Sequence, residues 1–458
     1  MTESKLGLRT DRHLSVAGLQ SMIDNGDLDT VIVCFTDMQG RLQGKRMHAA
    51  YFRDHVLAHG SEGCNYLLAV DVDMNTVDGY SISSWERGYG DMFFALDTDT
   101  LRLLPHQPGA AMVQCDLTWL DGSPVVQSPR TILKNQLEQA AERGFRALAG
   151  TELELMIFDT SYADAWRTGF HDLTPAVPYN ADYSILAGSI VEPLLREIRN
   201  AMYGAGMNVE SAKGECNLGQ QEIGFLYADA LTTADNHVVY KNAAKEIAAS
   251  RGRSITFMAK YDEREGNSCH IHLSLRDDHG NAILDQDGQR SALYDRFIAG
   301  VLATMADFTL LYAPNINSYK RFADGSFAPT KIGWGYDNRT CAVRLVGHGL
   351  SARLENRVPG GDVNPYLALA AMIAGGLYGI DHELELPPES IGNAYESDLP
   401  TVPQTLAEAR DRFGSSALSR KLLGDAVVDH YTHMAEVELA AFNASVTDWE
   451  RRRGFERL

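Results

Sequence analysis

Four short segments of the chain place charged or metal-binding side chains at every second position. They are residues 152–154, 220–222, 270–272 and 353–357. A repeat of two residues is that of a β-strand, so each segment presents one polar face and one mostly apolar face. Together the polar faces carry four glutamates, two histidines and two arginines. This combination predicts a sheet that curves around a polar, cation-filled cavity.

Composition limits the class of protein. The 458 residues, 45% of them hydrophobic, are enough for a large core and for several domains. The net charge of -20 argues against non-specific binding to nucleic acid or to a membrane surface, which needs excess Lys and Arg. The six scattered cysteines form no CxxC pair and are predicted to be reduced thiols. Because no signal peptide and no membrane span is evident, we expect a cytoplasmic protein.

The chain divides into a small N-terminal part and a larger C-terminal part. Residues 1–24 are predicted to form a tail and the start of a first helix, residues 25–116 a small α+β domain, and residues 117–458 a second domain. Turn-forming residues at 121–129 mark the boundary, where Ser128 and Pro129 are typical of a helix start. Helices are expected over residues 15–25, 128–143, 192–202, 232–250, 366–380, 406–413 and 425–443.

Two pairs of carboxylates are candidate metal ligands. Glu152 and Glu154 are two residues apart on one predicted strand, which separates them by about 6.5–7 Å and leaves room for each to hold its own divalent ion. Glu215 and Glu222 flank a turn that contains Gly219, and such a turn can bring them to a common point. A solvent-facing strand edge and an ordinary polar loop are the alternative interpretations of the two segments.

Histidines and arginines complete the set of candidate site residues. His270, His272 and Ser274 share one strand face, where two histidines near glutamates fit a metal ligand and a phosphate or nucleotide contact. Five arginines fall within residues 321–357: Arg321, Arg339, Arg344, Arg353 and Arg357. Carboxylates, imidazole and guanidinium groups together suit Mg²⁺ or Mn²⁺ plus a polyphosphate. The chain has neither a P-loop nor a strand-linked Gly-x-Gly-x-x-Gly, so a nucleotide would bind in another way.

At these residues the chain resembles the glutamine synthetase superfamily, from about residue 25 to its end. The segments that carry the resemblance are 128–130, 152–154, 214–222, 236–245, 257–260, 270–274, 317–321, 338–344, 353–357, 364–367 and 446–449. The resemblance implies an α+β fold in which a β-grasp N-terminal domain precedes a catalytic domain whose curved antiparallel sheet forms a funnel. It also implies a homo-oligomer, commonly a dodecamer of two hexameric rings with active sites between subunits.

The resemblance assigns the metal ligands. It implies two or three Mg²⁺ or Mn²⁺ ions per active site, with ATP as a co-substrate. The first ion would be held by Glu154, Glu215 and Glu222, and the second by Glu152, His270 and Glu355.

The resemblance also assigns the groups that bind the substrates. Arg339 and Arg344 would contact the phosphates and the phosphoryl group in transfer, Arg357 the acyl phosphate, and Arg321 the α-carboxylate of glutamate. Further residues implied at the nucleotide are His272 beside the phosphates and Tyr227, Ser274 and Arg353 beside the adenosine. In this chemistry ATP converts a poor electrophile, the carboxylate, into γ-glutamyl phosphate, from which an amine then displaces phosphate.

Two positions depart from the ammonia-using members of the family. Phe327 stands in the flap where those enzymes have a glutamate that helps to bind ammonium and removes its proton. A phenyl ring accepts no proton, but it could line an apolar slot or lie over a cationic amine. Before Gly266, Glu265 replaces an asparagine that binds the amino group of glutamate, and its carboxylate could pair with that ammonium or with a polyamine. We therefore predict an organic amine as the acceptor, and prefer a small one such as ethanolamine.

Three alternatives remain open at this point. They are a γ-glutamylpolyamine synthetase, a true glutamine synthetase that uses ammonia, and a catalytically inactive relative.

Asp71 and Asp73 are candidates for the aspartate that a neighbouring subunit supplies in this family. Tyr395 lies near the tyrosine that some bacterial members adenylylate, but its surroundings differ.

Overall fold

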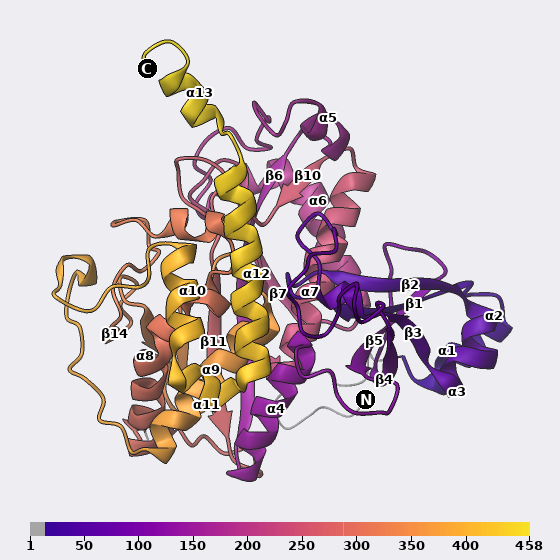
Figure 1. Ribbon diagram of the computed structural model, residues 1–458, viewed down its shortest axis with the longest axis horizontal. Helices are drawn as coiled ribbons and strands as arrows, with labels where there is room; N and C mark the ends of the chain where they lie inside the picture. Colours follow the sequence, from indigo (N-terminus) through magenta and orange to yellow (C-terminus); the bar gives the residue numbers. More distant parts are fainter. Residues whose placement is uncertain (1–13, 287) are drawn as a thin grey trace.

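The computed structural model describes residues 14–286 and 288–458. The predicted tail lies outside the described residues as far as residue 13. Two large sheets, a two-stranded hairpin and a set of helices make up the described chain, and the five-stranded sheet lies to one side of the larger body (Figure 1). This arrangement is the predicted α+β class.

The smaller sheet lies near the N-terminus and has five strands in the order β2-β1-β5-β4-β3. Their bounds are β1 (Thr30–Thr36), β2 (Leu42–His48), β3 (Ser61–Cys64), β4 (Asp91–Leu103) and β5 (Ala110–Thr118). The central pair, β1 and β5, is parallel, and the other pairs are antiparallel, which is the arrangement expected of a β-grasp domain. Short helices accompany it: α1 (Val16–Asp24), α2 (Ala49–Tyr51), η1 (Phe52–Val56), α3 (Leu57–His59) and η2 (Asn65–Leu68).

The larger sheet is built around the long strand β6 (Arg146–Phe158). Its main path runs β14-β15-β16-β11-β6-β8-β7, and β9 and β10 also pair with β6. The other bounds are β7 (Val209–Gly214), β8 (Gln220–Phe225), β9 (Ala228–Asp229), β10 (Ser254–Thr256), β11 (Cys269–Arg276), β14 (Trp334–Tyr336), β15 (Val343–Val346) and β16 (Arg353–Asn356). The pairs are antiparallel, as expected, except β14 with β15, which is parallel. A separate hairpin joins β12 (Asp285–Gln286) to β13 (Gln289–Arg290).

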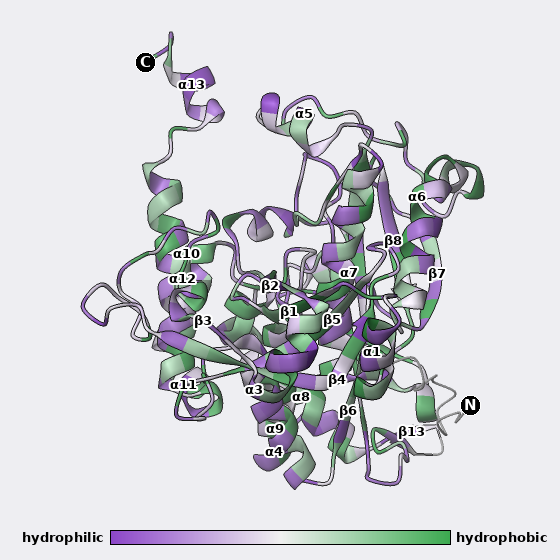
Figure 2. Cartoon of the chain, turned by 90° about the vertical axis from the view of Figure 1, so that its right-hand side faces the viewer, coloured by the Kyte–Doolittle hydropathy of each residue, from purple (hydrophilic) through white to green (hydrophobic). Residues whose placement is uncertain are grey.

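The helices of the larger body follow most of the predicted ranges. Their bounds are α4 (Pro129–Glu142), α5 (Tyr162–Arg167), α6 (Ile185–Gly204), α7 (Ala230–Ser250), α8 (Ala292–Tyr312), η3 (Ile316–Arg321), η4 (Gly349–Ser351), α9 (Pro365–Asp381), η5 (Ala394–Glu396), α10 (Leu406–Ser415), α11 (Ala417–Leu423), α12 (Asp425–Ala444) and α13 (Asp448–Gly454). Figure 2 shows hydrophilic and hydrophobic residues alternating along the outer helices α6 and α12, as expected where helices cover a core. None of the described helices has the length and hydrophobicity needed to cross a bilayer.

Helix α9 lies at the centre of the larger body. Its residues are buried from Pro365 to Gly376, and α4, α7 and α8 pack against it. Glycines allow α8 and α9 to approach closely, because a Cβ on Gly379 would lie 2.0 Å from the carbonyl oxygen of Arg296. The predicted apolar segment 366–380 is therefore a buried core helix.

A buried ionic network joins the two parts of the chain. Arg130 of α4 donates hydrogen bonds to Asp97 of β4 and Asp116 of β5, both at 2.6 Å, and to Asp235 of α7 at 3.0–3.1 Å. The hydroxyl of Tyr366 in α9 donates to Asp235 at 2.6 Å. The network lies close to residue 117, where we propose that the N-terminal domain ends and the second domain begins.

Candidate active site

The register of the larger sheet gathers the predicted site residues around β6. β6 pairs with β11 so that Glu152 lies opposite His270, and with β8 so that Glu154 lies opposite Glu222. Cβ atoms of residues opposite each other on antiparallel strands are about 4.5–5.5 Å apart. Segments that are distant in sequence therefore present their polar side chains on one surface of the sheet.

Three carboxylates form the first candidate metal group. Glu154, Glu215 and Glu222 each offer an oxygen that lies within 4.8 Å of the others. Glu154 also accepts hydrogen bonds from the backbone N–H of Ser268 at 2.7 Å and from Nε2 of Gln220 at 3.0 Å. The group is therefore the predicted one, and its central carboxylate is fixed in place.

The first group has the electrostatics of a cation site. Burial, and after it the negative charge of Glu152, raises the pKa of Glu222 to about 8, against the lowering effect of Lys213. The Lys213 ammonium forms an ion pair with Glu215 and lies 3.5 Å from a Glu222 oxygen. Carboxylates removed from water in this way need a cation, and an all-oxygen set suits Mg²⁺ or Mn²⁺. The residues present fit the implied metal.

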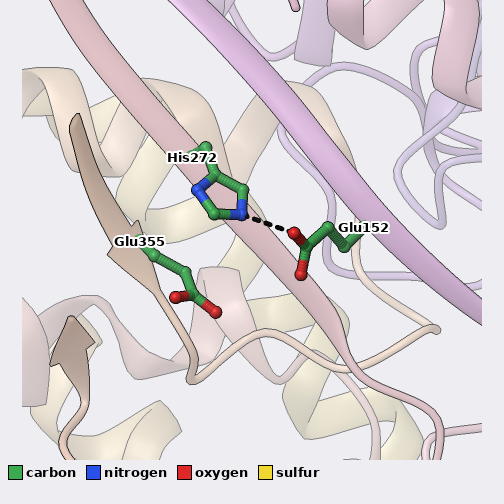
Figure 3. A group of neighbouring side chains, drawn as sticks. All are labelled: Glu152, His272 and Glu355. Carbon is green, nitrogen blue, oxygen red and sulfur yellow. Dashed lines mark hydrogen bonds and ion pairs between the residues drawn. The ribbon is translucent and has the colours of Figure 1, made fainter. Parts of the chain in front are cut away.

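The second candidate group combines two carboxylates with imidazole. Glu152, His272 and Glu355 offer ligand atoms within 4.8 Å of one another, and their side chains converge from three strands (Figure 3). His272 Nε2 lies 2.9 Å from Glu152, whereas Nδ1 of His270, the predicted ligand, lies 3.3 Å from Glu152 and 3.4 Å from Glu355. Among the described residues the buried Nε2 of His270 has no hydrogen-bond partner. Both imidazoles thus reach this group, and the six predicted metal ligands converge.

Protonation states in the second group favour metal binding. Burial alone would raise the pKa of Glu152, but hydrogen bonds from His270 and His272 lower it far below its usual range. Burial, and then the positive charge of Arg357, lowers the pKa of His270. An ionised Glu152 and a neutral His270 are the forms that coordinate a divalent metal.

Three of the predicted arginines lie against the second group. Glu355 is fully buried, forms an ion pair with Arg357 and accepts a hydrogen bond from Arg344 at 2.9 Å. Arg353 donates from Nε to Nδ1 of His272 at 3.1 Å. A phosphate or acyl phosphate bound beside the carboxylates would meet these guanidinium groups.

The other two predicted arginines are placed differently. Arg321 is 2% exposed and donates to the backbone carbonyls of residues 357–359 at 2.7–3.1 Å, so it braces the segment that follows β16. Burial lowers its pKa to about 10, against the attraction of Glu154. Arg339 is exposed in the loop between β14 and β15, where its charge acts on Asp337. Their predicted roles in binding remain predictions.

A cavity of about 510 Å³ opens beside both groups. Its lining includes the four residues predicted for the nucleotide, which are Tyr227, His272, Ser274 and Arg353. This volume falls within the roughly 300–1,000 Å³ typical of small-molecule sites. Lys213 and Tyr183 also line the cavity, although neither was predicted from the sequence. The two-residue spacing of Lys213 from Glu215 is the signal that could have found the lysine.

The two residues that depart from the family are both at the surface. Phe327 is 55% exposed, has a φ of +57° and accepts a hydrogen bond through its carbonyl from Arg357 at 3.3 Å. Glu265 is exposed, and the carbonyl of Gly266 accepts a hydrogen bond from Gln220 at 3.0 Å. Both side chains are exposed to solvent and can meet a ligand.

A third acidic group lies next to the first. Asp182, Glu215 and Cys216 have ligand atoms within 4.8 Å of one another. Burial, followed by the charges of Asp182 and Glu265, raises the pKa of the Cys216 thiol to about 11. The six cysteines are free, as predicted.

The remaining predicted positions lie outside these groups. Burial, and then the charges of Asp71 and Asp73, raises the pKa of Glu438 on α12, so the two aspartates lie beside that helix. The hydroxyl of Tyr395 donates to the carbonyl of Ala328 at 3.1 Å, which ties it to the flap.

Comparisons with known proteins match most of the chain. Residues 126–454 match the family model described as glutamine synthetase, catalytic domain. The chain is similar to γ-glutamylethanolamide synthetase of Streptomyces coelicolor, at 59% identity over 97% of this chain and 96% of the relative. It is also similar to glutamate–isopropylamine ligase of Pseudomonas sp, at 36% identity over 95% and 96% of the two chains. γ-Glutamylputrescine synthetase of Escherichia coli is 31% identical over 92% of this chain and 90% of the relative.

Solved structures match the fold over nearly the same length. A complex of GmaS with ADP has a TM-score of 0.83 at 26% identity and covers 96% of this chain and 99% of its own. A novel glutamine synthase homologue, at 23% identity and a TM-score of 0.78, covers 93% of this chain and 98% of its own and shows the fold alone. The predicted two-part α+β architecture with a curved sheet is confirmed.

Proposed function

The chain belongs to the glutamine synthetase family, and from this premise we propose that it is an ATP-dependent ligase that joins glutamate to a small organic amine. The observation that carries the proposal is the similarity, over almost the whole chain, to a γ-glutamylethanolamide synthetase. The product would be a γ-glutamyl amide, formed through γ-glutamyl phosphate.

The two metal groups would hold Mg²⁺ or Mn²⁺, two or three ions per site. When bound, such ions neutralise the phosphates of ATP and polarise the phosphoryl group. Arg344 and Arg357, each paired with Glu355, would stabilise the charge of the phosphoryl group and of the acyl phosphate. We also propose that Arg339 contacts the phosphates of ATP and that Arg321 binds glutamate.

The proposed reaction has two balanced steps. A γ-carboxylate oxygen of glutamate forms a bond to the γ-phosphorus of ATP as the bond to the ADP oxygen breaks. The neutral amine nitrogen then attacks the acyl carbon, the carbon–oxygen bond to phosphate breaks with its electron pair, and the nitrogen loses a proton to water. Phe327 supplies no base for deprotonating ammonium, which supports an organic amine as acceptor.

A diamine is the second candidate acceptor. Asp182 and Glu265 act on Cys216 beside the first metal group, and carboxylates at this position would pair with a second ammonium. The similarity to a γ-glutamylputrescine synthetase agrees with this alternative.

We further propose a cytoplasmic homo-oligomer of two stacked rings with shared active sites. The six free cysteines are compatible with a reducing compartment. Helix α13 stands away from the rest of the molecule (Figures 1 and 2). Trp449 within it and Phe455 just after it are 67% and 94% exposed, which suits burial against another subunit.

An amine panel tests the proposal. ADP release is measured with glutamate, Mg²⁺ and, in turn, ethanolamine, ethylamine, isopropylamine, putrescine and ammonium. We expect the highest kcat/KM with a small monoamine. Highest turnover with putrescine would favour the second candidate, and highest turnover with ammonium would make the chain a true glutamine synthetase. No turnover with any amine would indicate an inactive relative.

A further inference from the structure

Lys213 places an ammonium group inside the first metal group. Its position on β7 is opposite Glu222 on β8 and two residues before Glu215, so all three side chains lie on one face. Nζ forms an ion pair with Glu215 and lies 3.5 Å from an oxygen of Glu222. The lysine therefore contacts two of the three carboxylates that would hold the first metal ion.

A metal ion and this ammonium cannot share the two carboxylates. Like charges a few ångströms apart repel strongly where burial has lowered the local dielectric constant, and Glu222 is buried. A divalent ion that binds Glu154, Glu215 and Glu222 must therefore displace Nζ of Lys213.

The cavity offers the displaced ammonium another place. Nζ already lies 5.2 Å from the centre of the Tyr183 ring, and both residues line the 510 Å³ cavity together with His272 and Arg353. The loop that contains Tyr183 is hydrogen-bonded to β7, since the N–H of Tyr183 donates to the carbonyl of Gly214 at 3.2 Å. A Cβ on Gly214 would lie 2.4 Å from the carbonyl oxygen of Ala181, so only glycine lets the loop lie this close. The aromatic ring is thus held within reach of the lysine.

We propose that Lys213 is an internal cation that competes with the divalent metal for Glu215 and Glu222 and, once displaced, binds the phosphates of the nucleotide from the Tyr183 side of the cavity. The inference rests on the proposed function, since it takes ATP as the ligand. It makes metal binding and nucleotide binding mutually supportive, because the metal releases the lysine that the phosphates then receive.

The first test measures the metal alone. Mn²⁺ is titrated into metal-stripped protein without substrates, and the free ion is followed by electron paramagnetic resonance. Lys213→Met should bind Mn²⁺ about 10-fold more tightly than the unchanged protein, because the competing charge is gone. Lys213→Arg, which keeps the charge, should bind within about 3-fold of the unchanged protein. Equal or weaker Mn²⁺ binding by Lys213→Met would overturn the proposal.

The second test measures ADP in the presence of saturating Mn²⁺. Lys213→Met should bind ADP about 10-fold more weakly by calorimetry, because one charged phosphate contact is lost. Unchanged ADP affinity would overturn the phosphate contact. Lys421→Met, on the exposed side of α11, is the matched control and should alter neither affinity. Thermal melting checks that each variant is folded, and Lys213→Gln replaces Lys213→Met if the methionine variant is not.

The two proposals can fail separately. If the amine panel shows turnover but Lys213→Met binds Mn²⁺ no more tightly, the role of Lys213 is wrong and the proposed function stands. If no amine is ligated while Lys213→Met binds Mn²⁺ more tightly, the proposed function is wrong and the competition stands.

Discussion

Phe327 is the residue at which this chain departs most clearly from the chemistry of ammonia-using relatives. Its exposed ring stands on a backbone that only a few non-glycine residues adopt, at a strain of roughly 1–2 kcal/mol. The same residue accepts a hydrogen bond from Arg357, which reaches Glu355 at the second metal group. The flap therefore places an apolar side chain close to the arginine and the carboxylate of the second metal group.

Replacing the Phe327 ring with a carboxylate tests whether the ring excludes ammonium as a substrate. Phe327→Glu should raise kcat/KM for ammonium by about 10-fold or more, because a positioned base contributes roughly 10²–10⁴-fold when its geometry is good. The same change should lower kcat/KM for the preferred organic amine. Steady-state ADP release measures both values. Phe327→Leu, which removes the ring without adding a base, should not gain ammonium activity, and an equal gain in both variants would contradict the argument.

At the residue scale, the sequence predicted which side chains converge but not how they share their contacts. Alternating polar residues identify Glu152, Glu154 and Glu355 because strand pairing turns a two-residue repeat into a shared surface. The competition between His270 and His272 for Glu152 depends on side-chain rotamers, which the repeat does not encode. Arg321 shows the same limit, since its backbone partners follow from the path of the chain after β16.

At the scale of elements, one buried arginine ties four of them together. Arg130 of α4 binds Asp97 on β4, Asp116 on β5 and Asp235 on α7. The guanidinium is almost fully buried and is paired with Asp235, which is buried too, whereas Asp116 also pairs with Lys134 at 2.7 Å. Arg130 thus helps to fix the orientation of the smaller sheet against the larger body, together with Arg102 of β4, which donates to Asn236 of α7 at 2.8 Å.

Arg130→Met should therefore be costly. Removing one partner of a buried ion pair destabilises a protein by about 3–5 kcal/mol, because the remaining charge is left buried and unpaired. Arg143→Met removes a comparable pair with Asp381 at the surface and should lose only about 0–1 kcal/mol. Urea unfolding followed by circular dichroism gives both free energies of unfolding. Equal losses in the two variants would show that the network is not buried in solution.

Element boundaries were predictable where local chemistry marks them. Asn364 and Ser128 precede prolines at helix starts, and α9 and α4 begin there. Helix α6 begins at Ile185, before the predicted start at residue 192. Its first turn exposes Ile185 and Leu186 to solvent, so the apolar residues there do not mark a buried face and did not predict the first turns. The parallel pairing of β14 with β15 depends on the path of the intervening loop, which no local repeat specifies.

At the scale of the whole molecule, His430 connects the C-terminal helix α12 to the N-terminal part of the chain. Its Nε2 lies 2.8 Å from the sulfur of Met38, and its ring packs 4.7 Å from that of Tyr80. Burial lowers the pKa of His430 to about 3. One contact between α12 and the N-terminal part of the chain is thus made by an imidazole that stays neutral in the folded protein, and His433 makes another with the carbonyl of Asp78 at 2.7 Å.

This histidine makes stability depend on pH in a defined direction. The unfolded chain binds a proton at His430 below about pH 6.5 and the folded chain only near pH 3, so the unfolded state holds more protons in between. Its contribution is complete above pH 6.5 and is lost as the pH falls, by about 1.4 kcal/mol per pH unit. In His430→Gln the free energy of unfolding, measured in urea, should fall less steeply between pH 6.5 and 4.5. His279→Gln, at an exposed position, should keep the original slope.

Metal removal tests the two carboxylate groups in the intact protein. A ligand that binds only the folded state adds about 2.7 kcal/mol at 100 times its dissociation constant, so Mn²⁺ should raise the melting temperature of metal-stripped protein. A double variant, Glu154→Gln with Glu355→Gln, removes one carboxylate from each group and should lose this shift. A shift of unchanged size in the double variant would place the stabilising metal elsewhere.

The central position of β6 has a consequence for synthesis on the ribosome. This strand must wait for β8, β9, β10 and β11 before its hydrogen bonds are satisfied, and β11 ends at Arg276. Translation of residues 159–276 takes roughly 6–24 s at about 5–20 residues per second. For that time the nascent chain carries an unpaired strand with three leucines and two alanines, which other chains or a chaperone could bind.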